Sequence, residues 1–220
     1  MTPYKLAIFD FDGTLADSSA WMLVAFTACA DKFGFRKLSR DEIEALRGQD
    51  NRAILCALEL PMWKLPAIAK HVRAMAAEAE PPPLFAGAPD ALRALKASGL
   101  TLGVVSSNSE YAIRRALGPE LAALIDHYAC DASIFGKPGK FRQLIKAARV
   151  KRAEVVAVGD ETRDIEAARK AGVACAAVTW GYATERVLRD FAPDFVFASM
   201  EDMAAQLGAM ADAGRAGAES

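Results

Sequence analysis

The sequence has few of the residues on which histidine- and cysteine-based chemistry depends. It contains two histidines, His71 and His127, and neither has potential metal ligands close to it in the sequence. A Ser-His-Asp triad and a histidine-rich zinc site are therefore poor candidates. The four cysteines are scattered without a CxxC pair, and each has apolar neighbours, as small core residues have. Such thiols suit a reducing compartment, and we expect a cytoplasmic protein.

The sequence also lacks a charge excess and a long apolar run. Lys and Arg total 27 and Asp and Glu total 28, so the formal net charge is -1. A nearly neutral chain has no strong field to attract nucleic acid or an acidic membrane. No apolar run is long enough to cross a bilayer, and no basic stretch precedes an apolar signal core. We expect a soluble protein with a small diffusible substrate and no nucleic-acid or membrane partner. The oligomeric state stays open.

A short apolar run near the N-terminus ends in two carboxylates. The run Tyr4–Phe9 is typical of a buried strand and is followed by Asp10, Asp12 and Gly13. Because successive side chains of a strand point to opposite faces, Asp10 and Asp12 should share one face. Gly13 permits a tight turn whose amide N–H groups can bind an anion. This pattern indicates a carboxylate nucleophile with an acid/base partner; the competing interpretation is a solvated strand end with an Asp-Gly turn.

Three further segments place polar side chains directly after apolar runs. They are Ser106 and Ser107 after residues 102–105, Lys137 before Pro138, and Asp160 and Asp164 after residues 155–158. Each has an ordinary explanation alone, since serines cap helices, lysines lie in solvent and aspartates after glycine form turns. Together with the first segment they fall at the carboxyl ends of predicted strands, where ligands bind in α/β sheets. We therefore interpret them as one functional site.

The chain after residue 82 alternates between short apolar runs and helical patterns. The expected strands, besides the first, are Leu102–Val105, Ile125–Cys130, Val155–Val158, Val173–Val178 and Phe195–Phe197. Their nearly continuous apolar character is typical of parallel strands covered on both faces. Strands alternating with helices predict an α/β fold, a doubly wound (Rossmann-like) parallel sheet.

Residues 17–81 have no strand-like run, and their apolar residues recur at helical spacing. A capping box at Ser39–Glu42 should start one helix, and Arg47 with the glycine after it should end that helix. The triple proline 81–83 cannot extend a helix and should link the insert to the rest. We predict an α/β core of residues 1–16 and 82–207, an inserted helical lid of residues 17–81, and a disordered tail of residues 208–220.

The first segment, DFDGTLADS, resembles the DxDGTLxDS motif of the haloacid dehalogenase-like hydrolases, and the other three segments follow in that family's order. The resemblance extends over about residues 4 to 207. It implies a Mg²⁺-dependent phosphatase in which Asp10 attacks phosphorus to form an aspartyl phosphate, and Asp12 acts as general acid and then general base. It also implies a helical cap. The segment Trp180-Gly181-Tyr182 resembles one common among phosphoglycolate phosphatase-like members.

The resemblance also implies roles for the remaining site residues. Mg²⁺ would be held by Asp10, the backbone carbonyl of Asp12, and Asp160. Asp164 would bind a metal water or orient Lys137, and Glu161 would accept a metal-bound water or simply begin the loop. Ser106, the Ser107 amide, Lys137 and Gly13 would bind the phosphoryl oxygens. Arg47 would either reach a substrate oxygen or serve only as a helix terminus.

Other functions remain open at this stage. A phosphotransferase related to β-phosphoglucomutase would use the same Asp10 and Asp12, and cap residues would decide between the two. Dehalogenation is disfavoured, because a halide leaving group does not need the acid Asp12. A phospho-aspartate receiver would have no reason for Asp12 or a lid, and a binding module without activity would not require all these polar positions.

Overall fold

The computed structural model describes residues 4–47, 49, 51–132 and 136–216. Its centre is a six-stranded sheet in the order β3-β2-β1-β4-β5-β6, with all neighbouring strands parallel. The strands are β1 (Leu6–Phe9), β2 (Thr101–Val105), β3 (His127–Ala129), β4 (Val155–Gly159), β5 (Ala174–Val178) and β6 (Phe195–Phe197). Each expected strand is present, and the predicted doubly wound parallel sheet is confirmed.

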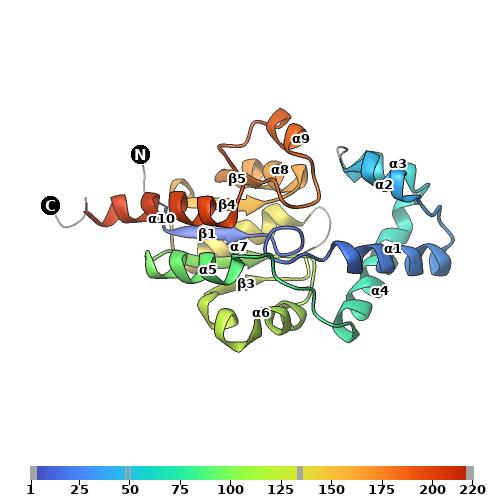
Figure 1. Cartoon of the computed structure of the whole chain (residues 1–220), viewed down its shortest axis with the longest axis horizontal. Helices are drawn as coiled ribbons and strands as arrows, with labels where there is room; N and C mark the ends of the chain where they lie inside the picture. The colour runs from blue at the N-terminus through green and yellow to red at the C-terminus, as the bar shows by residue number, and fades with distance from the viewer. Residues whose placement is uncertain (1–3, 48, 50, 133–135, 217–220) are drawn as a thin grey trace.

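Helices cover both faces of the sheet, because the strands are apolar on both sides (Figure 1). Along β1, Leu6 and Ile8 pack into one buried cluster, whereas Ala7 and Phe9 pack into the other. The first cluster is completed by α7 (Lys137–Ala148), α8 (Thr162–Ala171) and α9 (Glu185–Asp190). The second is completed by α5 (Ala88–Ala97), α6 (Glu110–Leu124) and α10 (Met200–Ala216). Each fully buried large side chain contributes about 1.5–3 kcal/mol.

The order of the strands determines where a ligand can bind. From β1 the chain adds β2 and β3 on one side, then crosses to β4, β5 and β6 on the other. The carboxyl ends of β1 and β4 therefore meet at the point where the winding reverses, which is the usual ligand site of such sheets. The polar segments after β1, β2 and β4 converge at this edge.

Several helix ends follow from local chemistry. The Ser39 side chain accepts from the N–H of Glu42, whose carboxylate accepts from the N–H of Ser39, so the predicted capping box starts α2 (Arg40–Leu46). Ser109 caps α6 by accepting from the N–H of Ala112. Gly172 ends α8 in the left-handed conformation, with φ of 74°.

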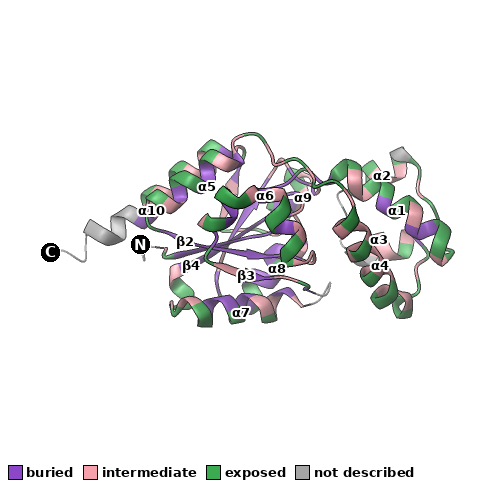
Figure 2. Ribbon diagram, turned by 90° about the horizontal axis from the view of Figure 1, so that it is seen from below, coloured by how far each residue is buried: buried purple, intermediate pink, exposed green. Residues whose placement is uncertain are grey.

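The helices between β1 and α5 form a body at one end of the sheet (Figure 1). They are α1 (Ser19–Phe33), α2, α3 (Asn51–Ala57), the 3₁₀ turn Met62–Lys64 and α4 (Leu65–Glu78). Figure 2 shows far less buried surface in these helices than in the core, and α4 has no buried residue. We call this body the cap.

The two linkers of the cap pair with each other. The N–H of Asp17 donates to the carbonyl of Pro83 at 2.9 Å, and the N–H of Phe85 donates to the carbonyl of Leu15 at 3.0 Å. Ala16 forms an antiparallel bridge with Leu84 between these bonds. The cap therefore joins the core through one short two-stranded stalk.

The C-terminal segment differs from the expectation that it frays from Gly208. Helix α10 continues to Ala216, because Leu207 and Ala211 are buried against the sheet and hold this helix in place. Residues 217–220 lie outside the described residues. Within the described ranges, no helix is both long and apolar enough to cross a membrane.

Candidate active site

Asp10 lies at the carboxyl end of β1, where its N–H still donates to the carbonyl of Val158 on β4. Strand alternation directs its side chain to the sheet face that carries α7 and α8. Lys137, the first residue of α7, donates to Oδ2 of Asp10 at 2.5 Å and also pairs with Oδ1 of Asp164 on α8. All three side chains are buried. Burial alone would lower the pKa of Lys137, but the charges of Asp10 and Asp164 raise it and keep the lysine protonated.

Asp160 follows β4 and is fully buried beside Gly13. Its Oδ1 accepts from the Thr14 hydroxyl at 2.9 Å and its Oδ2 accepts from the N–H of Tyr182 at 2.8 Å. Burial, together with the charges of Glu161, Asp164 and Asp10, raises the pKa of Asp160 well above its usual range. The carboxylate is fixed in position but lacks a cation of its own among the described side chains.

The buried charges at this edge are unbalanced. Four carboxyl groups face two cationic groups: Asp10, Asp160, Glu161 and Asp164 against Lys137 and Arg163. Oxygens of Asp10, Asp160 and Asp164 lie within 4.8 Å of one another. Such an excess of hard, closely spaced oxygen ligands suits a divalent cation, which would offset their repulsion. The donor set therefore fits Mg²⁺.

Two hydrogen bonds hold the Asp12 side chain in position. The Ser18 hydroxyl donates to its Oδ1 at 2.7 Å, and the Asn108 side-chain amide donates to its Oδ2 at 2.8 Å. The Tyr182 hydroxyl lies 2.7 Å from the Ser18 oxygen. Burial and the nearby charge of Asp10 raise the pKa of Asp12 to about 6, against the lowering effect of the Ser18 hydrogen bond. A carboxyl group with this pKa can both give and take a proton near neutral pH.

Ser106 is buried at the carboxyl end of β2, and the N–H of Asn108 donates to its Oγ at 3.1 Å. Ser107 is half-buried next to it. Both serines lie at the edge of the sheet that carries Asp10, as the sequence predicts. Ile134 and Phe135, which precede Lys137 in the sequence, lie outside the described residues.

Gly13 has the left-handed conformation that the predicted tight turn requires, and its predicted contact with phosphate stays a prediction. Its N–H donates to the carbonyl of Ala16 at 2.8 Å inside the tight loop, and is therefore already used. Its φ is +78°, and a Cβ at this position would lie 2.2 Å from a carboxylate oxygen of Asp160. The glycine is needed because it lets that carboxylate approach the backbone.

Glu161 and Arg163 form a half-buried ion pair beside the cluster. Glu161 is also the N-cap of α8, where its N–H donates to Oδ2 of Asp164 at 3.1 Å. Glu161 therefore stands where the loop after β4 meets α8, which agrees with the interpretation that it simply begins this loop. Arg163 brings a second positive charge to the site.

Arg47 projects from the cap onto the loop after β5. Its Nε donates to the carbonyl of Tyr182 at 2.9 Å, and its Nη2 donates to the carbonyl of Gly181 at 3.1 Å. In return, the N–H of Thr184 donates to the carbonyl of Arg47 at 3.3 Å. Arg47 is the C-cap of α2, so the helix-terminus interpretation has a structural basis. Its guanidinium also connects cap to core.

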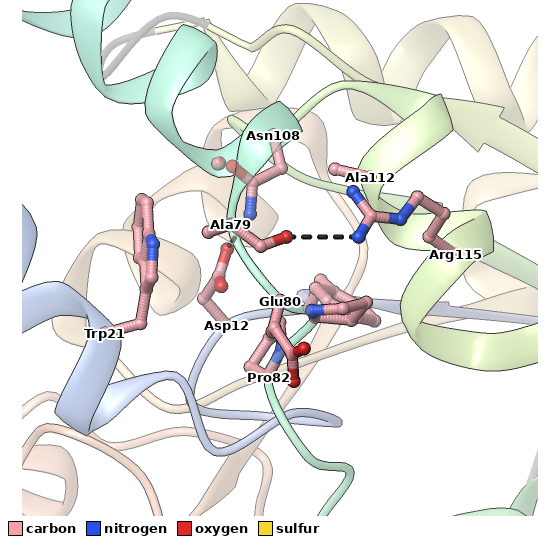
Figure 3. A pocket seen from close by; sticks show the side chains of 11 residues that line it. Asp12, Trp21, Ala79, Glu80, Pro82, Asn108, Ala112 and Arg115 are labelled. Carbon is pink, nitrogen blue, oxygen red and sulfur yellow. Dashed lines mark hydrogen bonds between the residues drawn. The ribbon is translucent and has the colours of Figure 1, made fainter.

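A pocket opens beside Asp12, between the cap and the core (Figure 3). Its lining comes from the loops after β1 and β2, from α1, α4 and α6, and from the exit linker. It comprises Phe11, Asp12, Trp21, Ala76, Ala79, Glu80, Pro81, Pro82, Asn108, Ala112 and Arg115. A group attached to an oxygen next to Asp12 would extend into this space.

Sequence reasoning assigned no role to Ser18, Asn108, Tyr182 and Arg163. Ser18 closes the first motif, Asn108 follows the serine pair, and Tyr182 ends the Trp-Gly-Tyr segment, so each stood inside a recognised pattern. Asn108 contacts Asp12 across 96 positions and Tyr182 contacts Ser18 across 164, and no local pattern reveals such pairings. Arg163 had no signal, since arginine is common in a first helical turn.

Comparison with known proteins identifies the family. The family model described as haloacid dehalogenase-like hydrolase matches residues 7–178. The phosphoglycolate phosphatase of Synechococcus elongatus is 33% identical over 198 residues, which cover 89% of this chain and 93% of that protein. The phosphoglycolate phosphatase of Agrobacterium fabrum is 31% identical, covering 91% of this chain and 89% of that protein.

Among solved structures, a haloacid dehalogenase-like family hydrolase of Streptococcus pneumoniae aligns with a TM-score of 0.75 and 21% identity, covering 94% of this chain and 99% of the other. This likeness concerns the fold. The family match and the relatives together extend across both the core and the cap. The chain therefore belongs to the haloacid dehalogenase-like hydrolases, and it is a phosphatase of their phosphoglycolate phosphatase-like subgroup.

Proposed function

We propose that this protein is a Mg²⁺-dependent phosphatase that hydrolyses a small phosphate monoester through an aspartyl phosphate on Asp10. The observation that carries the proposal is the pair of differently held carboxyl groups. Asp10 is fixed by the protonated Lys137, whereas Asp12 has a pKa of about 6 and is oriented by Ser18 and Asn108. One group is suited to attack and the other to proton transfer.

In the first step, a carboxylate oxygen of Asp10 attacks phosphorus as the bond to the leaving oxygen breaks. Asp12 gives its proton to that oxygen, so that a neutral alcohol departs. Lys137 and Ser106 provide positive charge and a hydroxyl donor for the phosphoryl oxygens, which carry negative charge throughout.

In the second step, a water attacks the phosphorus of the aspartyl phosphate while Asp12 accepts its proton. Inorganic phosphate leaves and the Asp10 carboxylate is restored. Mg²⁺ held by Asp10, the Asp12 carbonyl and Asp160 would neutralise charge on the transferring group. Asp164, which pairs with Lys137 and lies within reach of the same ion, would hold the lysine in place.

We further propose that the cap acts as a lid. Its attachment through paired linkers around Asp17 and Pro83 would permit a rigid-body rotation once the bonds of Arg47 to the loop after β5 open. Closure would exclude water from the pocket beside Asp12 and enclose the leaving group. The relatives named phosphoglycolate phosphatase favour a short acid as that leaving group.

A substrate screen with the full-length protein tests the proposal. Purified protein with Mg²⁺ is assayed for released phosphate on 2-phosphoglycolate, several sugar phosphates and p-nitrophenyl phosphate, beside an Asp10→Asn variant. We expect turnover by the wild type and a loss of at least about a thousandfold in the variant, as for loss of a covalent nucleophile. A variant that keeps more than about a tenth of wild-type kcat would exclude Asp10 as nucleophile. Isomerised sugar phosphate without phosphate release would instead identify a mutase.

A further inference from the structure

The pocket beside Asp12 has one cationic side chain among the described residues that line it. Phe11, Ala76 and Ala112 make apolar walls, Trp21 adds an indole face with one neutral N–H donor, and Pro81 and Pro82 have no backbone N–H to offer a ligand. The amide of Asn108 already donates to Asp12. Arg115, on the core helix α6, is therefore the charged donor available to an anion in this pocket, beside the neutral indole N–H of Trp21.

Arg115 is already oriented toward the cap's exit. Its Nη1 donates to the carbonyl of Ala77 at 2.8 Å. Its Nη2 donates to the carbonyl of Ala79 at 3.1 Å, the bond drawn in Figure 3. The guanidinium also lies over the Tyr111 ring, 5.8 Å from its centroid. A guanidinium has five N–H donors, so these two bonds leave further donors for an anion. Glu80, the other charged residue on this rim, is exposed and its charge is solvated.

We propose that Arg115 recognises an anionic group, a carboxylate, on a short leaving group. The inference rests on the proposed phosphatase function and deepens it. The leaving oxygen must lie beside Asp12 to receive its proton, so the carbon chain attached to that oxygen extends into the pocket toward Arg115. A planar guanidinium can donate two parallel hydrogen bonds to the two oxygens of a carboxylate.

The competing interpretation is that Arg115 only caps α4. The carbonyls of Ala77 and Ala79 lie at the C-terminus of that helix, where carbonyls need donors and positive charge is favourable. Such a residue would hold the cap linker in place for every substrate alike. A specificity residue would instead affect only substrates that carry the anionic group.

Two substrates that differ in one group separate these roles. The full-length wild type, Arg115→Gln and Arg115→Lys are assayed on 2-phosphoglycolate and on 2-hydroxyethyl phosphate, in which the carboxylate is replaced by a neutral alcohol. The measured quantity is the ratio of the two kcat/KM values. We expect the wild type to prefer 2-phosphoglycolate, and Arg115→Gln to lower the ratio by about 10- to 100-fold, as loss of a charge-assisted contact does. Arg115→Lys, which keeps the charge without the planar pair of donors, should give an intermediate ratio.

Arg114→Gln is the matched control, because Arg114 pairs with Glu110 and lies over Tyr128, away from the pocket. It should leave the ratio unchanged. If Arg115→Gln leaves the ratio unchanged, the inference is overturned and Arg115 only caps α4. If the glutamine variant does not fold, an unchanged ratio in Arg115→Lys has the same meaning. A wild type without preference for 2-phosphoglycolate also overturns it. Failure of the wild type to hydrolyse p-nitrophenyl phosphate or any other ester would instead refute the proposed function.

Discussion

The hydroxyl oxygen of Ser18 lies 2.7 Å from Oδ1 of Asp12, to which it donates, and Ser18 is the residue from which the chain enters the cap. Because its one proton goes to the ionised Asp12, the Tyr182 hydroxyl, also 2.7 Å away, must donate to Ser18. The carboxyl group proposed as acid and base is thus oriented by residues at the cap entrance and in the loop that Arg47 contacts. This short chain of hydrogen bonds connects the cap to the group that we propose transfers the proton.

Replacing Ser18 should change the pH dependence of the first chemical step. The Ser18 hydrogen bond stabilises ionised Asp12 and so lowers its pKa, which burial raises to about 6. In the wild type, the rate of enzyme phosphorylation should fall as pH rises above about 6, because Asp12 must be protonated to act as acid. In Ser18→Ala this decline should move to higher pH. Single-turnover rates measured from pH 5 to about 9 would show the shift.

Ser19→Ala is the control for that experiment, because the Ser19 hydroxyl donates only to Asp17, on the exposed surface. Its pH dependence should match the wild type. A decline that stays in place or moves to lower pH in Ser18→Ala would contradict the assignment of the acid to Asp12.

Metal removal should stop the reaction reversibly and lower stability. Asp10, Asp160 and Asp164 repel one another in a buried site, so a bound Mg²⁺ should stabilise the folded state, by about 2.7 kcal/mol at a hundred times its dissociation constant. Ca²⁺ should also bind but support less activity, because it accepts looser geometry. Thermal unfolding with and without EDTA, Mg²⁺ and Ca²⁺ measures the first effect. Full activity after exhaustive chelation, with metal content confirmed as negligible, would exclude the metal mechanism.

The Asp160 site can be tested for metal through the same stability measurement. Asp160→Asn removes one negative charge from the cluster, so its Tm should rise less on addition of Mg²⁺ than that of the wild type. Asp126→Asn is a suitable control, since that carboxylate pairs with Lys96 away from the site. An undiminished Mg²⁺ response in Asp160→Asn would place the metal elsewhere.

Gly13→Ala should destabilise the protein more than an otherwise similar glycine substitution. Gly13 and Gly34 both have positive φ, +78° and +64°, so alanine costs about 1–2 kcal/mol of backbone strain at either position. At Gly34 a Cβ meets nothing within 4 Å, whereas at Gly13 it would lie 2.2 Å from the Asp160 carboxylate. That clash should add about 1–3 kcal/mol. Denaturant unfolding of the two variants gives the difference, and equal losses would mean that the loop relaxes around the methyl group.

Arg47→Ala tests whether this residue selects substrate or joins cap to core. Its donation to the carbonyls of Gly181 and Tyr182 favours the second role, so kcat/KM should fall by a similar factor on 2-phosphoglycolate and p-nitrophenyl phosphate. Each of these two partly exposed bonds is worth about 0.5–1.5 kcal/mol, so their joint loss should lower kcat/KM by roughly 5- to 150-fold. Arg36→Ala, whose contacts stay within the cap, is the control. A loss confined to 2-phosphoglycolate would restore the specificity role predicted from the sequence.

The sequence by itself determined the architecture and the positions of the chemistry. Nearly continuous apolar runs such as Val155–Gly159 can form only buried parallel strands here, and the polar residues after them must then meet at one edge of the sheet. The ends of α2, α6 and α8 follow from Ser39, Ser109 and Gly172, because caps are local chemistry. Strand alternation also fixed the face to which Asp10 points.

Only the tertiary structure decided how these residues work together. Lys137 meets Asp10 across 127 positions and Asn108 meets Asp12 across 96, so their pairing depends on strand order and helix placement. The same holds for Gly13, whose amide is used inside its own loop while its missing side chain admits Asp160. Arg47 and Arg115 look alike as helical arginines in the sequence. The packing of cap against core directs one to the loop after β5 and the other to the pocket beside Asp12, because long side chains bind whatever acceptors the fold brings within reach.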